Sequence, residues 1–333
     1  MGDLVQTLPA LTDAARAIPQ IKFDWVVDES FAQVPAWHSH VENVFPTALR
    51  RWGRNWIESL QSGEPQALLK RLRANQYDLI VDVQGGFKSA IAARLAKGPS
   101  TGHDRRGVHD WGAQFLYQRR FAVPKGMHSI SRMRRLLAAS LGYAAPETDV
   151  EYGIVRSRFE SPALDLPTPY LVFIHSTSWS SKVWPEHYWQ ELLSLATANG
   201  FQVILPWGDY VERERSTRIA AGNQQATVLP QLSISQKAAI INGAAGTVGL
   251  DTGLSHIAAA LDIPSVTIYG ATDPRLVGAT GKNQVHLASQ FECVYCHETE
   301  CTYPGPSEFK PACLVELKPE QVWQRLKVLM QST

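Results

Sequence analysis

The sequence predicts an α/β protein with two domains, each built around a parallel sheet covered by helices. Three observations lead to this prediction. Short apolar runs typical of buried strands alternate with longer segments of helical periodicity. The length of 333 residues exceeds what one hydrophobic core usually serves. The segment 156–169 is rich in Ser and Pro and lacks periodicity, so we expect it to link the two domains.

The first half opens with a helical pattern from Leu4 to Ile18, whose apolar face we expect to carry Leu4, Leu8, Leu11 and Ala15. The elements expected after it are strands at Phe23–Val27 and Val41–Phe45, a helix at Gln66–Asn75, a buried strand at Tyr77–Val83, a helix holding Lys88 and Arg94, and a helix at His128–Leu141. This half is therefore expected to form the first domain, residues 1–155.

The second half repeats the alternation more clearly. The expected elements are strands at Tyr170–His175, Gln202–Leu205, Gly246–Leu250 and Ser265–Tyr269, and helices at Pro185–Asn199, Glu212–Ala221, Ser233–Ala244, Ser255–Leu261 and Lys318–Met330. We expect residues 170–315 to form the second domain and residues 316–333 to form a closing helix.

Two segments of the second half are suited to binding an anion. The turn Asp251-Thr252-Gly253 leads from a buried strand into a helix, and the free N–H groups of a helix start attract negative charge. Hydroxyl groups and one cation follow an earlier strand, at Thr177, Ser178 and Lys182. Both segments should lie at the carboxyl edge of the same sheet. For the first segment, the alternative is that Asp251 is only an N-cap and His256 an ordinary first-turn residue. For the second, the alternative is a polar surface loop.

The charge is distributed unevenly, although the net charge is only +1. Residues 47–135 carry 17 Lys or Arg against 6 Asp or Glu, which suits an acidic partner, unless this is only a solvated face. The motifs of nucleic-acid-binding folds, dinucleotide-binding folds and P-loop enzymes are absent, so we expect no nucleic acid partner. We find no signal peptide and no apolar run long enough to cross a bilayer, which predicts a cytoplasmic protein.

Five motifs in one order resemble the ADP-heptose:lipopolysaccharide heptosyltransferases, a family of GT-B glycosyltransferases. They are Met1-Gly2-Asp3 with Thr7-Leu8-Pro9-Ala10, Asp82-Val83-Gln84-Gly85 with Lys88-Ser89, Lys182 with Trp184-Pro185, Leu205-Pro206-Trp207-Gly208, and Asp251 to His256. The segments Phe23–Val27 and Arg50–Trp52 look most like the heptosyltransferase I branch.

The resemblance implies two Rossmann-like domains that face a central cleft, with the acceptor on the N-terminal domain and the nucleotide sugar on the C-terminal one. It also implies an inverting transfer of L-glycero-D-manno-heptose from ADP-heptose to the Kdo of Kdo2-lipid A. The catalytic base would be Asp3, although Asp3 could also be only a helix cap. Because the acceptor is a lipid, the protein would sit peripherally on the inner face of the inner membrane, on an anionic surface.

Residue by residue, the resemblance assigns two binding sets and implies no required cofactor, since basic and hydroxyl groups can replace a metal at the diphosphate. The donor set is Thr177, Ser178, Lys182, Trp207, Glu212, Asp251, Thr252, Gly253 and His256. The acceptor set is Arg50, Arg51, Arg54, Gln84 and Lys88, because arginine forks and lysine suit the carboxylate of Kdo and the phosphates of lipid A.

The chain departs from the family at its start. In the family, Met-Gly-Asp follows a strand and a Ser-rich turn, whereas here it stands at residues 1–3. We therefore expect the N-terminal domain to lack its first strand, either because Met1 is a wrongly chosen start or because the protein is damaged. Because of this departure, the alternative that the chain is an inactive scaffold that binds an ADP-sugar stays open. A nucleotide-sugar epimerase of similar fold fits less well, because it needs no basic acceptor surface.

All four cysteines lie in one stretch, as Cys293-x2-Cys296-x4-Cys301-x11-Cys313. The C-x2-C start favours a structural zinc ion, but the later spacings match no standard zinc ribbon. A metal-free loop of reduced thiols is the alternative. Similar clusters occur in relatives such as heptosyltransferase II, so the alternative that this chain uses a different heptose acceptor stays open.

Overall fold

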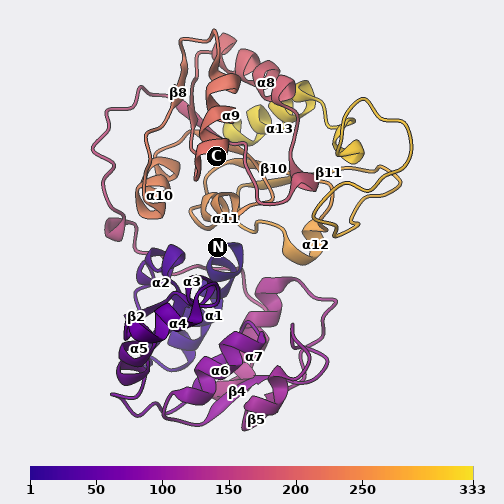
Figure 1. Cartoon of the computed structure of the whole chain (residues 1–333). Coiled ribbons are helices and arrows are strands. Elements are labelled where there is room, and N and C mark those ends of the chain that lie inside the picture. Colours follow the sequence, from indigo (N-terminus) through magenta and orange to yellow (C-terminus); the bar gives the residue numbers. More distant parts are fainter. Residues whose placement is uncertain (333) are drawn as a thin grey trace. The chain divides into compact units, whose positions relative to one another are not determined.

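The computed structural model describes residues 1–332, apart from the side chains at positions 56 and 60. The chain forms two compact units. We call residues 6–155 the N-terminal unit, coloured indigo to magenta in Figure 1. Residues 156–333 together with Met1–Val5 form the C-terminal unit, so the first residues group with the second half of the chain.

The C-terminal unit contains one six-stranded sheet in the order β11-β10-β9-β6-β7-β8, and every pairing in it is parallel. Its strands are β6 (Tyr170–Ile174), β7 (Gln202–Leu205), β8 (Ala226–Val228), β9 (Gly246–Leu250), β10 (Ser265–Tyr269) and β11 (Gln284–Ala288). The strands predicted at β6, β7, β9 and β10 are confirmed. The two unpredicted strands, β8 and β11, are the edges of the sheet. They are partly exposed, so they lack the continuous apolar run that marks a buried strand.

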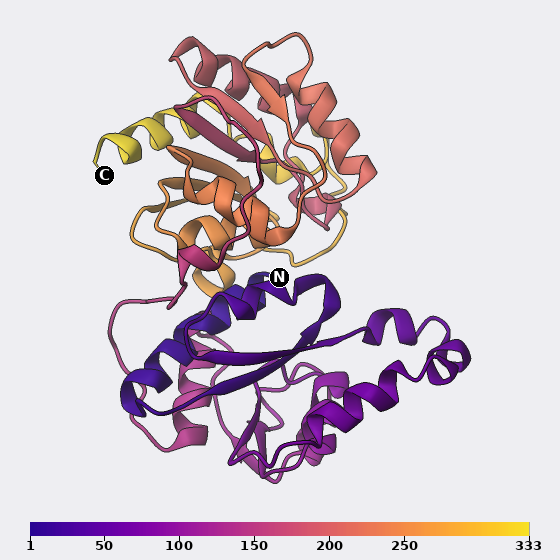
Figure 2. The same cartoon turned by 90° about the vertical axis from the view of Figure 1, so that its left-hand side faces the viewer.

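Helices cover both faces of this sheet (Figures 1 and 2). The helices are α8 (Glu186–Ala198), α9 (Tyr210–Ala220), α10 (Ile234–Asn242), α11 (Gly253–Ala260), α12 (Pro274–Val277) and α13 (Pro319–Gln331), with short 3-10 turns η3 (Arg156–Arg158), η4 (Ser180–Lys182) and η5 (Ala312–Leu314). Helices α8 and α13 pack together over a core that includes Trp189, Leu192 and Trp323. Helices α10 and α11 pack on each other, and α11 also contacts β9 and β10.

The N-terminal unit has two small parallel sheets instead of one continuous sheet. Strand β1 (Phe23–Asp28) pairs with β2 (Val41–Thr47), and β3 (Ile80–Asp82), β4 (Ser100–His103) and β5 (Arg119–Phe121) form the second sheet. The predicted strand Tyr77–Val83 is too long, because only three of its residues pair. Strand β4 was not predicted, because its four buried residues are polar or glycine and form no apolar run.

The two long helices of the N-terminal half are α1 (Gly2–Ala17) and α7 (Ser129–Leu141). The others are α2 (Gln33–Ala36), α3 (Leu49–Trp52), α4 (Trp56–Gln61), α5 (Glu64–Leu72) and α6 (Phe87–Leu95), with η1 (Glu29–Phe31) and η2 (Ala113–Leu116). The predicted amphipathic pattern of α1 is wrong in detail, because every residue from Val5 to Leu11 is buried. The helix packs on β2 and α7, and Arg134 of α7 donates to the buried carboxylate of Asp13 at 2.5 and 3.1 Å.

None of the helices within residues 1–332 combines the length and the apolar character that crossing a lipid bilayer requires.

Candidate functional site

The site is built where the six-stranded sheet reverses its order of winding. Strands β6 and β9 are neighbours, yet the chain leaves β6 toward β7 and leaves β9 toward β10, on the other side. Loops that follow two such strands diverge and leave room for a ligand beyond their carboxyl ends. The hydroxyl of Thr177, after β6, donates to the carbonyl of Asp251, after β9, at 3.4 Å. The prediction that these two segments lie at one edge of one sheet is therefore confirmed.

Asp251 is the centre of the polar contacts at this edge. Its Oδ2 accepts hydrogen bonds from Lys182 Nζ and from Thr272 Oγ1, both at 2.7 Å, and its Oδ1 lies 3.6 Å from His256 Nε2. The residue is only 8% exposed. Burial alone raises the pKa of Asp251, but the neighbouring His256 ring and the Lys182 charge outweigh it and hold the pKa well below its usual range. Asp251 is thus a buried, paired carboxylate, and it is not the N-cap of α11, which is Thr252.

The start of α11 presents free backbone donors beside this carboxylate. Thr252 is the N-cap in extended conformation, and its side chain makes no capping hydrogen bond. Ser255 turns its hydroxyl back to the carbonyl of Leu250 at 2.6 Å, so it does not cap the helix either. Uncapped N–H groups with the helix dipole behind them attract an anion, as the sequence predicts for Thr252 and Gly253.

The first residues of the chain lie against α11, within the same unit. A Cβ atom on Gly2 would come within 2.9 Å of Cδ2 of His256, and one on Gly253 would come within 2.2 Å of Cε of Met1. A side chain at either position would therefore displace the residue opposite. Asp3 follows as an exposed residue in the first turn of α1, inside the helix and not at its cap. Its carboxylate is accessible, as a general base requires.

Lys182 is held by the 3-10 turn η4 and by an aromatic neighbour. Its Nζ lies 4.2 Å from the centre of the Trp179 ring. Ser178, the third predicted member of this loop, is exposed. The turn is anchored by backbone contacts with the cysteine-rich segment, since Ser181 N donates to the carbonyl of Thr299 at 3.2 Å and Ser180 Oγ donates to the same carbonyl.

The cysteine-rich segment thus acts through its backbone. Besides Thr299, the N–H groups of Tyr295 and His297 donate to the carbonyls of Gly270 and Ala271, next to Thr272. The segment therefore holds in place both Lys182 and Thr272, the two donors to Asp251. The structure gives the predicted structural zinc ion no support, because no group of three His, Cys, Asp or Glu in the described residues could hold a metal ion. The spacings between the cysteines already argued against a zinc ribbon.

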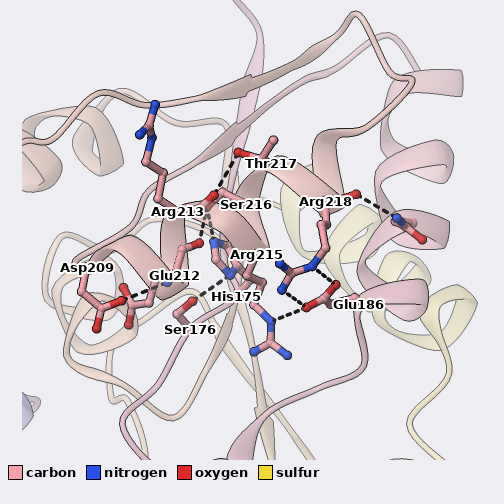
Figure 3. Close-up of polar contacts among 11 residues, drawn as sticks. His175, Ser176, Glu186, Asp209, Glu212, Arg213, Arg215, Ser216, Thr217 and Arg218 are labelled. Atoms are coloured by element: carbon pink, nitrogen blue, oxygen red, sulfur yellow. Dashed lines mark hydrogen bonds and ion pairs between the residues drawn. The ribbon is translucent and has the colours of Figure 1, made fainter.

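A second polar cluster supports the loop after β6 from the side of α9 (Figure 3). The ring of His175 contacts the hydroxyls of Ser216 at 2.7 Å and Ser176 at 2.8 Å. Since Ser216 donates its proton to the carbonyl of Glu212, it accepts from His175. Burial lowers the pKa of His175 to about 3, helped by the charge of Arg215. His175 is therefore neutral and holds the loop in place through its two hydrogen bonds.

The predicted nucleoside residues are placed by the loop after β7. Trp207 is 6% exposed, and its indole N–H donates to the carbonyl of Leu229, so its ring is almost fully buried. Glu212 accepts from the N–H of Gly208, and its own N–H is capped by Asp209. Both residues are near the carboxyl end of β7, beside β6. Lys237 of α10 was missed: it is 8% exposed, and burial lowers its pKa against the opposing charge of Glu212. A single Lys in an apolar helix gave no signal.

The predicted acceptor residues all lie in the N-terminal unit. Arg50 lies 3.2 Å from Asp28, and Arg51 binds both Glu29 and Glu64, at 3.2 and 2.8 Å. Arg54 is exposed after α3. These arginines therefore follow β2, and two of them already have carboxylate partners that an acidic ligand would have to displace.

The remaining two acceptor residues follow β3. The backbone N–H of Gln84 donates to Asp82 Oδ1 at 3.0 Å, and its side chain is exposed. Lys88 is exposed on α6. Asp82 is buried and also accepts from Tyr117 and Ser89, at 2.6 and 2.8 Å, so it fixes the Gln84-Gly85-Gly86 loop.

Comparisons with known proteins agree on one family. The model of glycosyltransferase family 9 (heptosyltransferase) matches residues 66–306. Lipopolysaccharide heptosyltransferase 1 of Pseudomonas aeruginosa is 44% identical over 99% of this chain and 95% of its own length. The solved structure of the E. coli heptosyltransferase WaaC with ADP has a TM-score of 0.86 and 41% identity, and the match covers 99% of this chain and 97% of that one. WaaC with ADP-2-deoxy-2-fluoro heptose gives a TM-score of 0.82 at 40% identity, over 98% and 96% of the two chains.

Proposed function

Because the chain belongs to glycosyltransferase family 9, the heptosyltransferases, we propose that it is the heptosyltransferase that adds the first heptose of the lipopolysaccharide core. Its fold is the α/β GT-B class that the sequence predicts. The reaction would transfer L-glycero-D-manno-heptose from ADP-heptose to the Kdo of Kdo2-lipid A, with inversion at the anomeric carbon. The observation that carries this proposal is the buried Asp251–Lys182 pair beside the uncapped start of α11.

The donor would bind to the C-terminal unit, with its diphosphate at the carboxyl edge of the sheet. Thr177, Ser178 and Lys182 would contact the phosphates, together with the N–H groups of Thr252 and Gly253. As the bond to the sugar breaks, negative charge builds up on the ADP leaving group, and these preorganised donors would stabilise it. A cation and a helix N-terminus do this without a metal ion, which is why no cofactor is part of the proposal.

Asp251 and His256 would hold the hydroxyls of the heptose. Lys182 donates one hydrogen bond to Asp251 through its ammonium group. It can donate three hydrogen bonds, so it can keep Asp251 and still reach a phosphate oxygen. Glu212 would accept from the ribose hydroxyls, and Trp207 would lie near the nucleoside.

Asp3 would be the base that removes the proton from the acceptor hydroxyl while that oxygen attacks the anomeric carbon. The packing of Gly2 on His256 and of Met1 on Gly253 supports this role, because it fixes the start of α1 beside the donor residues. Inversion requires such a base on the face of the sugar opposite the leaving group.

The N-terminal unit would supply the acceptor site, through Arg50, Arg51, Arg54, Gln84 and Lys88. The carboxylate of Kdo and the phosphates of lipid A fit these cations, and the excess of basic residues in 47–135 supports an acidic acceptor. A protein that acts on a membrane lipid would work at the cytoplasmic face of the inner membrane. We include that peripheral location in the proposal.

The test is release of ADP by the purified chain supplied with ADP-heptose. We expect release with Kdo2-lipid A and none without an acceptor. Release only with an acceptor that already carries one heptose would instead identify a heptosyltransferase II. Binding of ADP-heptose without release on either acceptor would identify the ADP-sugar-binding scaffold and refute the proposed transfer.

A further inference from the structure

Five large apolar side chains of the N-terminal unit are exposed. Trp111 is 83% exposed and Phe115 is 65% exposed. Three residues of α6 join them, since Phe87, Ile91 and Leu95 are 48%, 40% and 38% exposed. We call these five residues the α6–η2 patch. Large apolar side chains gathered on a surface mark a binding surface, whereas isolated ones do not.

The five side chains come from two elements that touch. Phe87, Ile91 and Leu95 recur every four residues, so they form one stripe along α6, while Ala90 and Ala93 are buried against the unit. Helix α6 packs on η2, and the N–H of Phe87 donates at 2.8 Å to Asp110, the residue before Trp111. The rings of Trp111 and Phe115 meet edge to face, with 6.2 Å between their centres.

The stretch of chain that carries the patch is rich in basic residues. From Phe87 to Arg120 the chain has seven Lys or Arg and two Asp. One of these acids, Asp110, is already engaged by the Phe87 N–H and by the His109 ring at 2.8 Å. The guanidinium of Arg120 lies 5.8 Å from the centre of the Phe115 ring, so one cation lies beside an aromatic residue of the patch.

We propose that the α6–η2 patch is the surface by which this protein docks on an anionic lipid bilayer, with Trp111 and Phe115 in the headgroup region. Tryptophan favours this region, where its ring is buried while its N–H stays hydrated. The cations add attraction to acidic headgroups. This inference deepens the proposed function, on which it rests for the identity of the lipid surface, since a lipid acceptor has to be reached in its membrane.

Charge and composition favour this occupant over two others. A second copy of the chain would bring the same positive residues to the contact and would be repelled. A single-stranded nucleic acid would stack on aromatic rings, but it gains nothing from the aliphatic stripe of Ile91 and Leu95. A bilayer uses the apolar side chains and the cations together.

The experiment is co-sedimentation of the full chain with vesicles of phosphatidylcholine, with and without 30 mol% phosphatidylglycerol, in the absence of donor and acceptor. We expect binding to the anionic vesicles that weakens with salt. The double variant Trp111→Ser/Phe115→Ser should bind the anionic vesicles at least about tenfold more weakly than the parent. In Arg119→Gln/Arg120→Gln, each lost charge should weaken binding about fivefold. The matched control is Val328→Ser on α13, which removes a side chain of similar exposure, 64%, and should bind like the parent.

A second measurement places Trp111. Vesicles with brominated acyl chains should quench tryptophan fluorescence in the parent and clearly less in Trp111→Phe, which keeps its affinity. Equal partitioning of the double variant and the parent, or equal quenching with and without Trp111, overturns the proposal. So does binding of single-stranded RNA that the same substitutions abolish. Vesicle binding is measured without sugar transfer, so the two proposals can fail separately. The docking surface can be wrong while ADP release succeeds, and vesicles can be bound by a chain that releases no ADP.

Discussion

Replacing Lys182 by Met removes the cation that holds Asp251, and the C-terminal unit should lose much of its stability. The side chains of Lys182 and Asp251 are only 13% and 7% exposed. A carboxylate left in such a place without its cation is poorly solvated, because water cannot replace the lost partner. Methionine keeps the length of the side chain, so the change removes charge and one hydrogen bond rather than packing.

The size of the effect follows from that burial. Breaking a buried ion pair by removal of one partner costs about 3–5 kcal/mol, and the retained hydrogen bond from Thr272 favours the lower end. For a unit of this size, a loss of about 3 kcal/mol lowers the melting temperature by about 6–12 °C. The second substitution Asp251→Asn should recover most of the loss, because the neutral amide still accepts from Thr272 and needs no cation.

The loss should also depend on pH. In the parent, the folded pKa of Asp251 lies below its unfolded value, so its contribution is present above about pH 4 and is lost as the pH falls through the depressed folded pKa. Without Lys182, the effect of burial is less opposed and the folded pKa rises. Protonation then relieves the variant at a higher pH, and the stability difference from the parent should narrow as the pH falls from 7 toward 4.

The assay is scanning calorimetry of the full chain at several pH values, with Lys282→Met as the control, because Lys282 is an exposed lysine of the same unit. The reasoning is refuted by a Lys182→Met variant that melts with the parent, or by a double variant no more stable than Lys182→Met alone. Either outcome would mean that Asp251 is already satisfied without the lysine, and that Lys182 is free to serve the donor alone.

Three further outcomes are expected. Asp3→Asn should abolish ADP release while calorimetric titration still shows ADP-heptose binding close to that of the parent; full turnover would exclude Asp3 as the base. His175, whose pKa is lowered to about 3, must bind a proton on unfolding below about pH 6.5, so its contribution is complete above that pH and declines below it by about 2 kcal/mol at pH 5. Urea unfolding of His175→Asn should show a smaller loss between pH 7 and pH 5, and an undiminished loss would assign the pH dependence elsewhere. Exhaustive dialysis against EDTA should leave the rate of ADP release unchanged, and a loss that zinc or magnesium restores would contradict the metal-free donor site.

The helix assignments illustrate what local pattern can and cannot provide. Helix α9 begins at Tyr210, two residues before the predicted start, because Asp209 caps it through the N–H of Glu212. The periodicity of α1 suggests one buried face, yet the helix is surrounded by neighbours from Val5 to Leu11. A sequence pattern records which residues are apolar, but the number of neighbours depends on segments far along the chain.

The sequence by itself determined the alternation of strands and helices, and therefore the parallel sheets. It also determined that the motifs that follow these strands lie at one edge of the sheet. Parallel strands present their carboxyl ends at the same edge, whatever their order in the sheet. Thr177, Lys182 and Asp251 could thus be assigned to one site without a structure.

Only the tertiary structure decided which strands are neighbours and which polar groups find partners. It placed β6 beside β9, joined Lys182 and Thr272 to Asp251, engaged Arg51 with Glu29 and Glu64, and set the backbone of the cysteine-rich segment behind the donor loops. Each of these contacts joins residues that are distant in the chain. Periodicity extends over a few residues, whereas burial, charge pairing and pKa depend on the packing of the whole unit.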